Sequence, residues 1–209
     1  MKSPPIFLLI LYLLGFDAFA QNSVTLIGRM SMRNRATQHY LEVIETRGRW
    51  IPIDIGYIDF GRSDYREYFF GGGGVVFKSN NLVIVQEGYL DQTAGTASGS
   101  ALYFQPFTVV SCGLTDKISG QVVYFTYLPL NKAGRLQYVL ETSKLEYNFK
   151  HFKAGGGYGA YRYGDEPWQH KPFVTATLKC GRLGDVEFWL QRLPGNHAQA
   201  QIRFSKTFE

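Results

Sequence analysis

Four histidines are the side chains best suited to act as a general base near neutral pH, and they stand at positions 39, 151, 170 and 197. A serine or threonine nucleophile needs such a base close by. No serine lies within a few residues of His170 or His197, and the chain has neither the Tyr-His-x-Ser nor the His-x-Ser-Asn pattern of membrane phospholipases and lipid A deacylases. The sequence therefore predicts that the protein is not an enzyme.

An enzymatic alternative rests on two connecting segments in the C-terminal third. Asp165, Glu166, Trp168 and His170 fall in one of them and His197 in the other. If both segments reach the same rim of the fold, a carboxylate could orient a histidine there, as a catalytic triad requires. A lipid-modifying enzyme, either an acyl hydrolase or an acyltransferase, is the first alternative function.

No metal, cofactor or nucleic acid is expected. The histidines are not paired at ligand spacing, and neither Cys112 nor Cys180 belongs to a Cys-x-x-Cys motif. The two cysteines could form one bridge in an exported chain or remain free. The glycine run 71–74 lacks the Lys-Ser/Thr ending of a phosphate loop, so we expect it to bend a strand or to let a large neighbouring side chain lie flat. The net charge is +5, but the basic residues are scattered, whereas nucleic-acid binding needs clustering.

The elements that carry these residues are β-like runs, each followed by a turn signal rich in Gly, Asn, Asp or Pro. Almost nothing has the pattern of a helix. We identify about twelve runs, at 24–33, 38–46, 50–60, 65–77, 82–91, 100–112, 119–128, 135–149, 152–163, 172–180, 185–193 and 197–208. The chain is therefore predicted to be all-β and antiparallel.

Apolar and polar residues alternate along the last three runs. In the run 185–193, for example, Val186, Phe188 and Leu190 share one face, and Glu187, Trp189 and Gln191 share the other. One apolar and one polar face per strand fits a membrane barrel with the apolar face outward. It also fits a soluble exported barrel with the apolar face inward, which would bind an apolar ligand and is the second alternative function.

Run length and connection length favour the membrane. Most runs have 9 to 14 residues, whereas soluble strands have about 5 to 6 and a bilayer needs about 9 to 11. The two longest connections, 92–99 and 164–171, are both odd-numbered hairpin loops, whereas the even-numbered turns such as 47–49 stay short. Short periplasmic turns, longer outer loops and an even strand count are typical of outer-membrane barrels. We expect about twelve strands, with ten possible, and both termini in the periplasm.

Aromatic residues make up 16% of the chain and many stand near the ends of runs, where interfacial girdles would place them. The residues expected in these girdles are Trp50, Tyr57, Phe60, Tyr65, Tyr89, Tyr127, Phe149, Phe152, Tyr161, Tyr163, Phe173 and Phe208.

The first twenty residues have the layout of a cleaved secretory signal. Lys2 precedes an apolar run, 6–16, and the small-x-small triplet 18–20 follows. The apolar run is shorter than the about 20 residues that a membrane-spanning helix needs. We expect a signal peptide at 1–20 and a single barrel domain at 21–209.

With these features the chain resembles the small outer-membrane β-barrel proteins of diderm bacteria, over nearly all of its length after the leader. Those proteins close with a strand of alternating apolar residues that ends in an aromatic, and Ile202, Phe204 and Phe208 match that assembly signal. Lys206 and Glu209 depart from the pattern. The resemblance implies a location in the bacterial outer membrane and contact with its lipid. It also implies recognition by the barrel assembly machinery, with a monomer favoured.

Side chains just fill the interior of a barrel of about eight strands. A barrel of twelve strands is wider, so its lumen is expected to keep open space. The polar faces place Arg29, Glu42, Asp54, Glu187 and Arg203 inside it. Four further charged residues share that expectation, namely Glu67, Glu87, Glu141 and Arg162. Charges of both signs could pair and plug the barrel, or they could line a narrow channel. The plug is favoured slightly, because opposite charges in low-dielectric surroundings usually pair. The predicted function is a porin-like channel for small polar or anionic solutes, or a structural barrel without transport.

Overall fold

The computed structural model describes residues 22–33, 36–62, 65–95 and 99–209. The predicted signal peptide, 1–20, lies outside the described residues. The strands are β1 (Asn22–Arg33), β2 (Ala36–Arg47), β3 (Trp50–Arg62), β4 (Tyr65–Gly71), β5 (Gly74–Ser79), β6 (Leu82–Ala94), β7 (Leu102–Gly113), β8 (Ile118–Pro129), β9 (Gln137–Asn148), β10 (Phe152–Tyr163), β11 (Gln169–Lys179), β12 (Asp185–Leu193) and β13 (His197–Phe208). Two short 3-10 turns, η1 (Gly181–Leu183) and η2 (Pro194–Asn196), flank β12.

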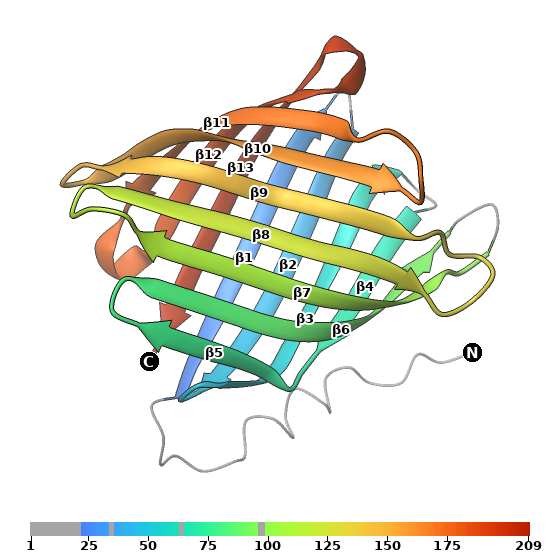
Figure 1. The fold of residues 1–209 in the computed structure, drawn as a ribbon, viewed down its shortest axis with the longest axis horizontal. Coiled ribbons are helices and arrows are strands. Elements are labelled where there is room, and N and C mark those ends of the chain that lie inside the picture. The colour runs from blue at the N-terminus through green and yellow to red at the C-terminus, as the bar shows by residue number, and fades with distance from the viewer. Residues whose placement is uncertain (1–21, 34–35, 63–64, 96–98) are drawn as a thin grey trace.

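These strands close into one antiparallel barrel (Figure 1). Apart from β4 and β5, which do not pair with each other, every strand pairs with its neighbours in sequence, and β1 also pairs with β13, which joins the two ends of the sheet. The segments β4 and β5 share one position, because both lie between β3 and β6. The barrel therefore has twelve strand positions, and the predicted fold class and strand number are confirmed.

The glycine run 71–74 divides what the sequence predicted as one strand, 65–77, into β4 and β5. Gly71 lies under a flat aromatic ring, because a Cβ atom there would come within 2.6 Å of the ring of Tyr89. Gly56 has the same relationship to the ring of Phe69. The glycines thus interrupt a strand and make room for large side chains, as expected from their composition.

Turns at one end of the barrel are shorter than the loops at the other. Two residues connect β2 to β3, with Gly48 at a φ of 59°, and two residues connect β5 to β6. Positive φ is the conformation that tight hairpin turns require. The opposite end carries the two longest connections, 95–101 and 130–136, each of seven residues, and we call it the long-loop end. The loop 164–168, expected among the two longest, lies at this end but has only five residues. The loops 95–101 and 164–168 are both shorter than predicted, since β6 continues to Ala94 and β11 begins at Gln169.

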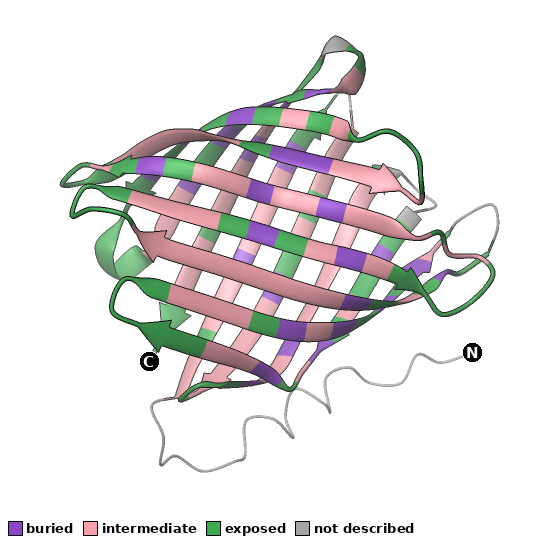
Figure 2. Ribbon diagram, in the orientation of Figure 1, coloured by how far each residue is buried: buried purple, intermediate pink, exposed green. Residues whose placement is uncertain are grey.

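Alternation along the strands sends apolar side chains outward and polar ones inward. In β12, Trp189 is 7% exposed whereas its neighbour Leu190 is 58% exposed. Figure 2 shows the buried positions scattered along strands between more exposed ones. Exposed apolar side chains recur around the outside, including Leu41, Phe70, Leu90, Leu145 and Val174. The outer surface is therefore apolar, and the alternative of a soluble barrel with inward apolar faces is wrong.

The prediction of aromatic girdles holds only in part. Trp50, Phe149, Phe152 and Phe208 are exposed near strand ends. Six of the expected girdle residues instead face the interior, either lining its cavities or stacking on a residue that does: Phe60, Tyr89, Tyr127, Tyr161, Tyr163 and Phe173. A position near the end of a run does not fix the face of the strand, and period-two alternation turned these rings inward.

Both cysteines are free, Cys112 within β7 and Cys180 exposed after β11. Among the residues that the structure describes, no helix is long and apolar enough to cross a membrane.

Candidate functional site: the barrel lumen

Three cavities lie in series inside the barrel. The central cavity has a volume of about 460 Å³. It shares Arg29, Glu141 and Lys171 with a second cavity of about 450 Å³, which reaches residues at the long-loop end. It shares Gln121 and Arg203 with a third cavity of about 350 Å³, which reaches the short-turn end. Cavities that share walls in this order follow the barrel from one end to the other.

The five predicted lumen residues all point into these cavities. Arg29, Glu42, Asp54 and Arg203 line the central cavity, and Glu187 lines the third one. Of the wider set, Glu67, Glu87 and Glu141 line the central cavity. Their role in passage of a solute stays a prediction.

Arg162 is a correction, because it lies on the outer side of β10. The inward positions of that strand include Tyr161 and Tyr163, which line the second cavity. Arg162 sits between two outward rings, with its guanidinium carbon 4.7 Å from the ring centre of Tyr138 and 5.2 Å from that of Trp168. Near the long-loop end an arginine can reach polar surroundings while its stem covers apolar surface.

A β-bulge in β9 lets both Glu141 and Lys144 face the lumen. Leu140 pairs with Ala160 and Ser143 with Tyr158, so that two β9 residues, 141 and 142, oppose a single residue of β10. The pairing with β8 also skips Glu141. Strict alternation would turn Glu141 and Lys144 to opposite faces, but both line the interior. The bulge shifts the alternation by one residue, as bulges near functional sites commonly do.

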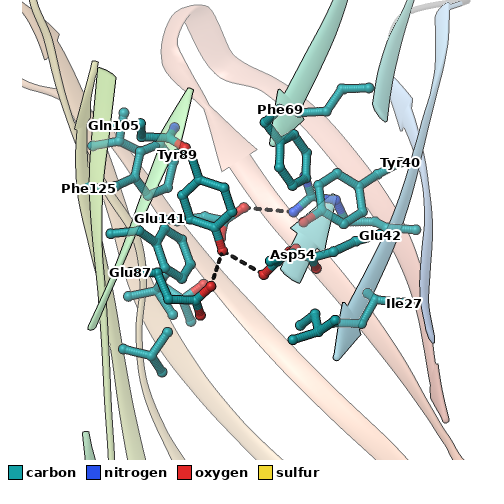
Figure 3. A pocket seen from close by; sticks show the side chains of 18 of the residues that line it. Ile27, Tyr40, Glu42, Asp54, Phe69, Glu87, Tyr89, Gln105, Phe125 and Glu141 are labelled. Atoms are coloured by element: carbon teal, nitrogen blue, oxygen red, sulfur yellow. Dashed lines mark hydrogen bonds and ion pairs between the residues drawn. The ribbon is translucent and has the colours of Figure 1, made fainter. Parts of the chain in front are cut away.

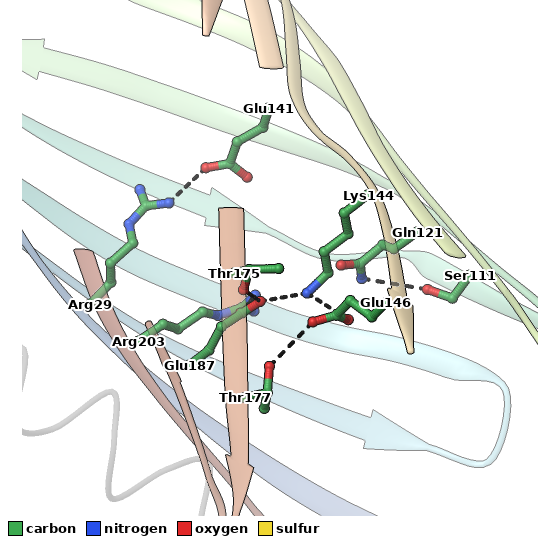
Figure 4. Close-up of polar contacts among 10 residues, drawn as sticks. All are labelled: Arg29, Ser111, Gln121, Glu141, Lys144, Glu146, Thr175, Thr177, Glu187 and Arg203. Atoms are coloured by element: carbon green, nitrogen blue, oxygen red, sulfur yellow. Dashed lines mark hydrogen bonds and ion pairs between the residues drawn. The ribbon is translucent and has the colours of Figure 1, made fainter. Parts of the chain in front are cut away.

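Glu141 forms an ion pair with Arg29 across the lumen, at 2.7 Å between Oε1 and Nη1 (Figure 4). β9 is the eighth of the twelve positions, so it lies seven positions from β1 in one direction and five in the other. The pair therefore joins nearly opposite walls. Because both residues line the first two cavities, the pair stands where those cavities meet.

A second ionic network lies toward the short-turn end (Figure 4). The Lys144 ammonium contacts Glu187 at 2.5 Å and Glu146 at 3.1 Å, and all three side chains are at most 8% exposed. Thr175 and Thr177 donate their hydroxyl protons to Glu187 and Glu146. Buried charges need such pairing to offset the loss of hydration.

Three carboxylates of the opposite wall form what we call the carboxylate cluster: Glu42 on β2, Asp54 on β3 and Glu87 on β6. The Tyr89 hydroxyl donates to Asp54 Oδ2 at 2.7 Å and lies 3.1 Å from Glu87 Oε2 (Figure 3). Among the described residues, no ion pair involves a member of this cluster.

Acidic and basic residues of the central cavity are separated by strand. Its basic side chains, Arg29, Lys171 and Arg203, come from β1, β11 and β13. Its acidic side chains come from β2, β3, β4 and β6, apart from Glu141, which Arg29 neutralises. Walls of opposite sign create an electric field across the lumen, which orients a dipolar solute that passes between them.

Six aromatic side chains also line the central cavity, and we call them the aromatic arc: Tyr40, Phe69, Tyr89, Phe107, Phe125 and Tyr127. Consecutive rings lie 5.4 to 5.8 Å apart between centres, from β2 round to β8. Alternation along each strand was the one sequence signal for this arc, because its members come from five strands, β2, β4, β6, β7 and β8.

The residues proposed for an enzymatic rim are dispersed. His170 lies in β11 and hydrogen-bonds the hydroxyl of Tyr158, and His197 is the first residue of β13. Glu166 forms an ion pair with Arg135 of the neighbouring loop. Trp168 contacts Arg162, and Asp165 lies in the loop between β10 and β11. The partner of His170 is a tyrosine and not a serine, and the enzymatic alternative gains no support from the structure.

The predicted assembly signal lies on the strand that closes the barrel. Ile202 pairs with Met30, Phe204 with Gly28 and Phe208 with Val24, all on β1. Phe204 and Phe208 are exposed on the outer surface. Recognition by an assembly machinery, contact with outer-membrane lipid and a monomeric state stay predictions.

No family model matches the chain, and no curated protein matches its sequence. Solved structures do match its fold. The KdgM porin has a TM-score of 0.65 at 14% identity, over 88% of this chain and 99% of that one. The same porin in complex with disordered oligogalacturonate has a TM-score of 0.65 at 15% identity and equal coverage. The NanC porin has a TM-score of 0.63 at 10% identity, over 88% of this chain and all of that one.

These comparisons establish that the chain has the fold of porins along almost the entire length of both. The prediction of a porin-like transmembrane barrel is thereby confirmed at the level of fold. At such low sequence identity, the similarity of fold does not indicate which solute this protein passes.

Proposed function

We propose that this protein is a narrow porin-like channel of the bacterial outer membrane that passes small polar solutes. The observation that carries the proposal is the series of three cavities, which follows the lumen from the long-loop end to the short-turn end. Charged and polar side chains recur along all three cavities, beside apolar and aromatic ones in the central cavity. A polar solute that passes can exchange hydrogen bonds with water for hydrogen bonds with these side chains.

The outer surface supports the membrane location. Apolar side chains that a soluble protein would bury are exposed on the lipid-facing side of the strands, with Leu190 and Val174 as examples at 58% and 59% exposure. A contiguous apolar surface of this extent marks contact with lipid or protein. The barrel has no open edge, as a membrane environment demands.

The size of the lumen supports a small solute. The central cavity of about 460 Å³ corresponds to roughly fifteen water molecules at about 30 Å³ each. The Arg29–Glu141 pair crosses the lumen beside it. A solute larger than a mono- or disaccharide would have to displace that pair.

We do not infer the sign of the solute's charge from the porins of similar fold. The KdgM porin has been seen with oligogalacturonate, a polyanion. In this chain the central cavity contributes five carboxylates against three basic groups, and four of the carboxylates have no ion-pair partner among the described residues. A polyanion would meet that unpaired wall, so we propose small polar solutes as the class.

Conductance across a planar lipid bilayer tests the function. The purified full chain should produce stepwise current increments in potassium chloride, each small because the lumen is narrow. A liposome-swelling series of neutral sugars should show a size limit between disaccharides and trisaccharides. A folded barrel, verified by its heat-shifted gel mobility, that inserts without any current would show that the protein is a structural barrel.

A further inference from the structure

The carboxylate cluster differs from the acids on the opposite half of the lumen, and Glu67 and the buried Asp91 likewise form no ion pair among the described residues. On the half formed by β9 to β13 and β1, the lumen-facing carboxylates Glu141, Glu146 and Glu187 each have a lysine or arginine partner. On the half that carries Glu42, Asp54 and Glu87, no basic side chain lines the central cavity from β2 to β8. The protein thus pairs one set of buried acids with cations, whereas the other set forms no ion pair among the described residues.

Asp54 is the most deeply buried member of the carboxylate cluster. Its side chain is 1% exposed, and its Oδ1 atom has no hydrogen-bond partner. The other oxygen accepts from the Tyr89 hydroxyl, which also faces Glu87, and the carboxyl groups of Glu42 and Glu87 lie within hydrogen-bonding reach of Asp54 (Figure 3). Buried charges are normally paired or bind a cation, because the cost of removing them from water must be offset. A carboxylate that has no ion-pair partner among the described residues, at the wall of a solute-sized cavity, therefore points to a positively charged ligand.

The aromatic arc indicates that the cation is organic. The rings of Phe69, Tyr89 and Phe107 line the same cavity as the cluster. The face of an aromatic ring attracts a cation, most strongly where water is excluded. The first ring of the arc already does so, since the Arg29 guanidinium carbon lies 4.7 Å from the ring centre of Tyr40. Carboxylates beside aromatic faces favour an ammonium group that carries an apolar substituent over a hydrated inorganic ion.

We propose that the carboxylate cluster and the adjoining rings of the aromatic arc bind the ammonium group of a small organic solute during its passage. This inference rests on the proposed function and refines it, because it names amines as a solute class that the central cavity retains. The ammonium group lies toward Glu42 and Glu87, with the enclosed Asp54 carboxyl behind them, and its substituent lies against the rings.

Block of the potassium current tests the inference. Propylammonium is the probe, and propionate and propanol are probes of similar size with a negative charge and with none. Propylammonium should reduce the current through the wild-type channel at millimolar concentration, whereas propionate and propanol at the same concentration should not. Equal effects of the three probes would overturn the inference, and that comparison needs no variant.

Two substitutions sharpen the test. The double variant Asp54→Asn, Glu87→Gln keeps side-chain size and removes two charges, so the propylammonium concentration at half block should rise by about tenfold or more, as loss of charge-assisted hydrogen bonds predicts. Asp116→Asn makes the same change in the exposed turn between β7 and β8 and should leave the block unchanged. An unchanged block in the double variant would refute the site.

The outcomes separate the inference from the function on which it rests. A barrel that carries no current overturns the proposed function, and the inference with it. A barrel that conducts potassium chloride but does not distinguish propylammonium from propionate overturns the inference alone. That second result would mean that the cluster is kept neutral by protons shared between its carboxyl groups.

Discussion

Arg29 on β1 and Glu141 on β9 form an ion pair from nearly opposite walls of the barrel, at 2.7 Å. The pair lies beside the bulge in β9, which lets Glu141 and Lys144 both face inward. Two side chains thus narrow the lumen at this level. A barrier of this kind can be changed by single substitutions without altering the sheet.

Glu141→Gln should change both the size and the selectivity of the channel. Loss of the carboxylate frees Arg29 to withdraw toward its own wall and leaves its charge uncompensated, so single-channel conductance should rise and the reversal potential in a salt gradient should shift toward anions. Both side chains are partly exposed in the lumen, so the free energy of unfolding should fall by about 1 kcal/mol or less.

The matched control is Glu166→Gln, which breaks the Arg135–Glu166 pair of two loops at the long-loop end. Its conductance and selectivity should equal those of the wild type. If Glu141→Gln also behaves as the wild type does, the ion pair is not the barrier to flow.

Lys144→Met should destabilise the barrel. The ammonium group of Lys144 is the closest cation to both Glu187 and Glu146, and its removal leaves two buried carboxylates, with Arg203 at 3.9 Å the remaining partner of Glu187. Breaking a buried pair in this way costs about 3 to 5 kcal/mol. Urea unfolding in lipid vesicles, followed by gel mobility, measures the change.

Lys153→Met is the control for that prediction. Lys153 lines the same cavity, and none of the ion pairs of the described residues includes it. Its unfolding midpoint should stay near that of the wild type. If both variants lost the same amount of stability, the barrel would need positive charge at this end in general, and not the specific ion pairs of Lys144.

Gly71→Ala should destabilise the barrel because the added methyl group would overlap the Tyr89 ring, at 2.6 Å from its nearest carbon atoms. The ring must then move away from Asp54 and Glu87. Overpacking of this kind costs about 1 to 3 kcal/mol. Gly28→Ala in β1 is the control, since nothing lies within 4 Å of its Cβ position. Similar unfolding midpoints for the two variants would mean that Tyr89 moves freely.

Leu190→Arg tests the lipid-facing surface. Leu190 is exposed on the outside of β12 near the middle of the strand. An arginine at the midplane of a membrane barrel costs about 2 to 4 kcal/mol, falling toward zero at the interface. Leu183→Arg, in the turn η1, should cost almost nothing. Equal stability of the two variants in lipid vesicles would contradict the placement of this surface against lipid.

The sequence by itself determined the strands, their number and the face to which most side chains point. Glu187 and Trp189 alternate with Phe188 and Leu190 along β12, and the structure turns the first two inward and the other two outward. This information is local, because successive side chains of a strand point to opposite faces wherever the strand lies. The same reasoning placed Arg29, Glu42, Asp54 and Arg203 on the lumen side.

Contacts across the lumen were decided only by the tertiary structure. Alternation puts Arg29 and Glu141 inside a barrel, but their meeting depends on closure of β1 against β13, and beside the pair a bulge shifts the alternation of β9 by one residue. The aromatic arc likewise joins rings from five strands, and Tyr89 and Tyr127 were expected at the membrane surface. The partners of a side chain inside a barrel are set by shear and closure, which belong to the whole sheet and leave no pattern in any single strand.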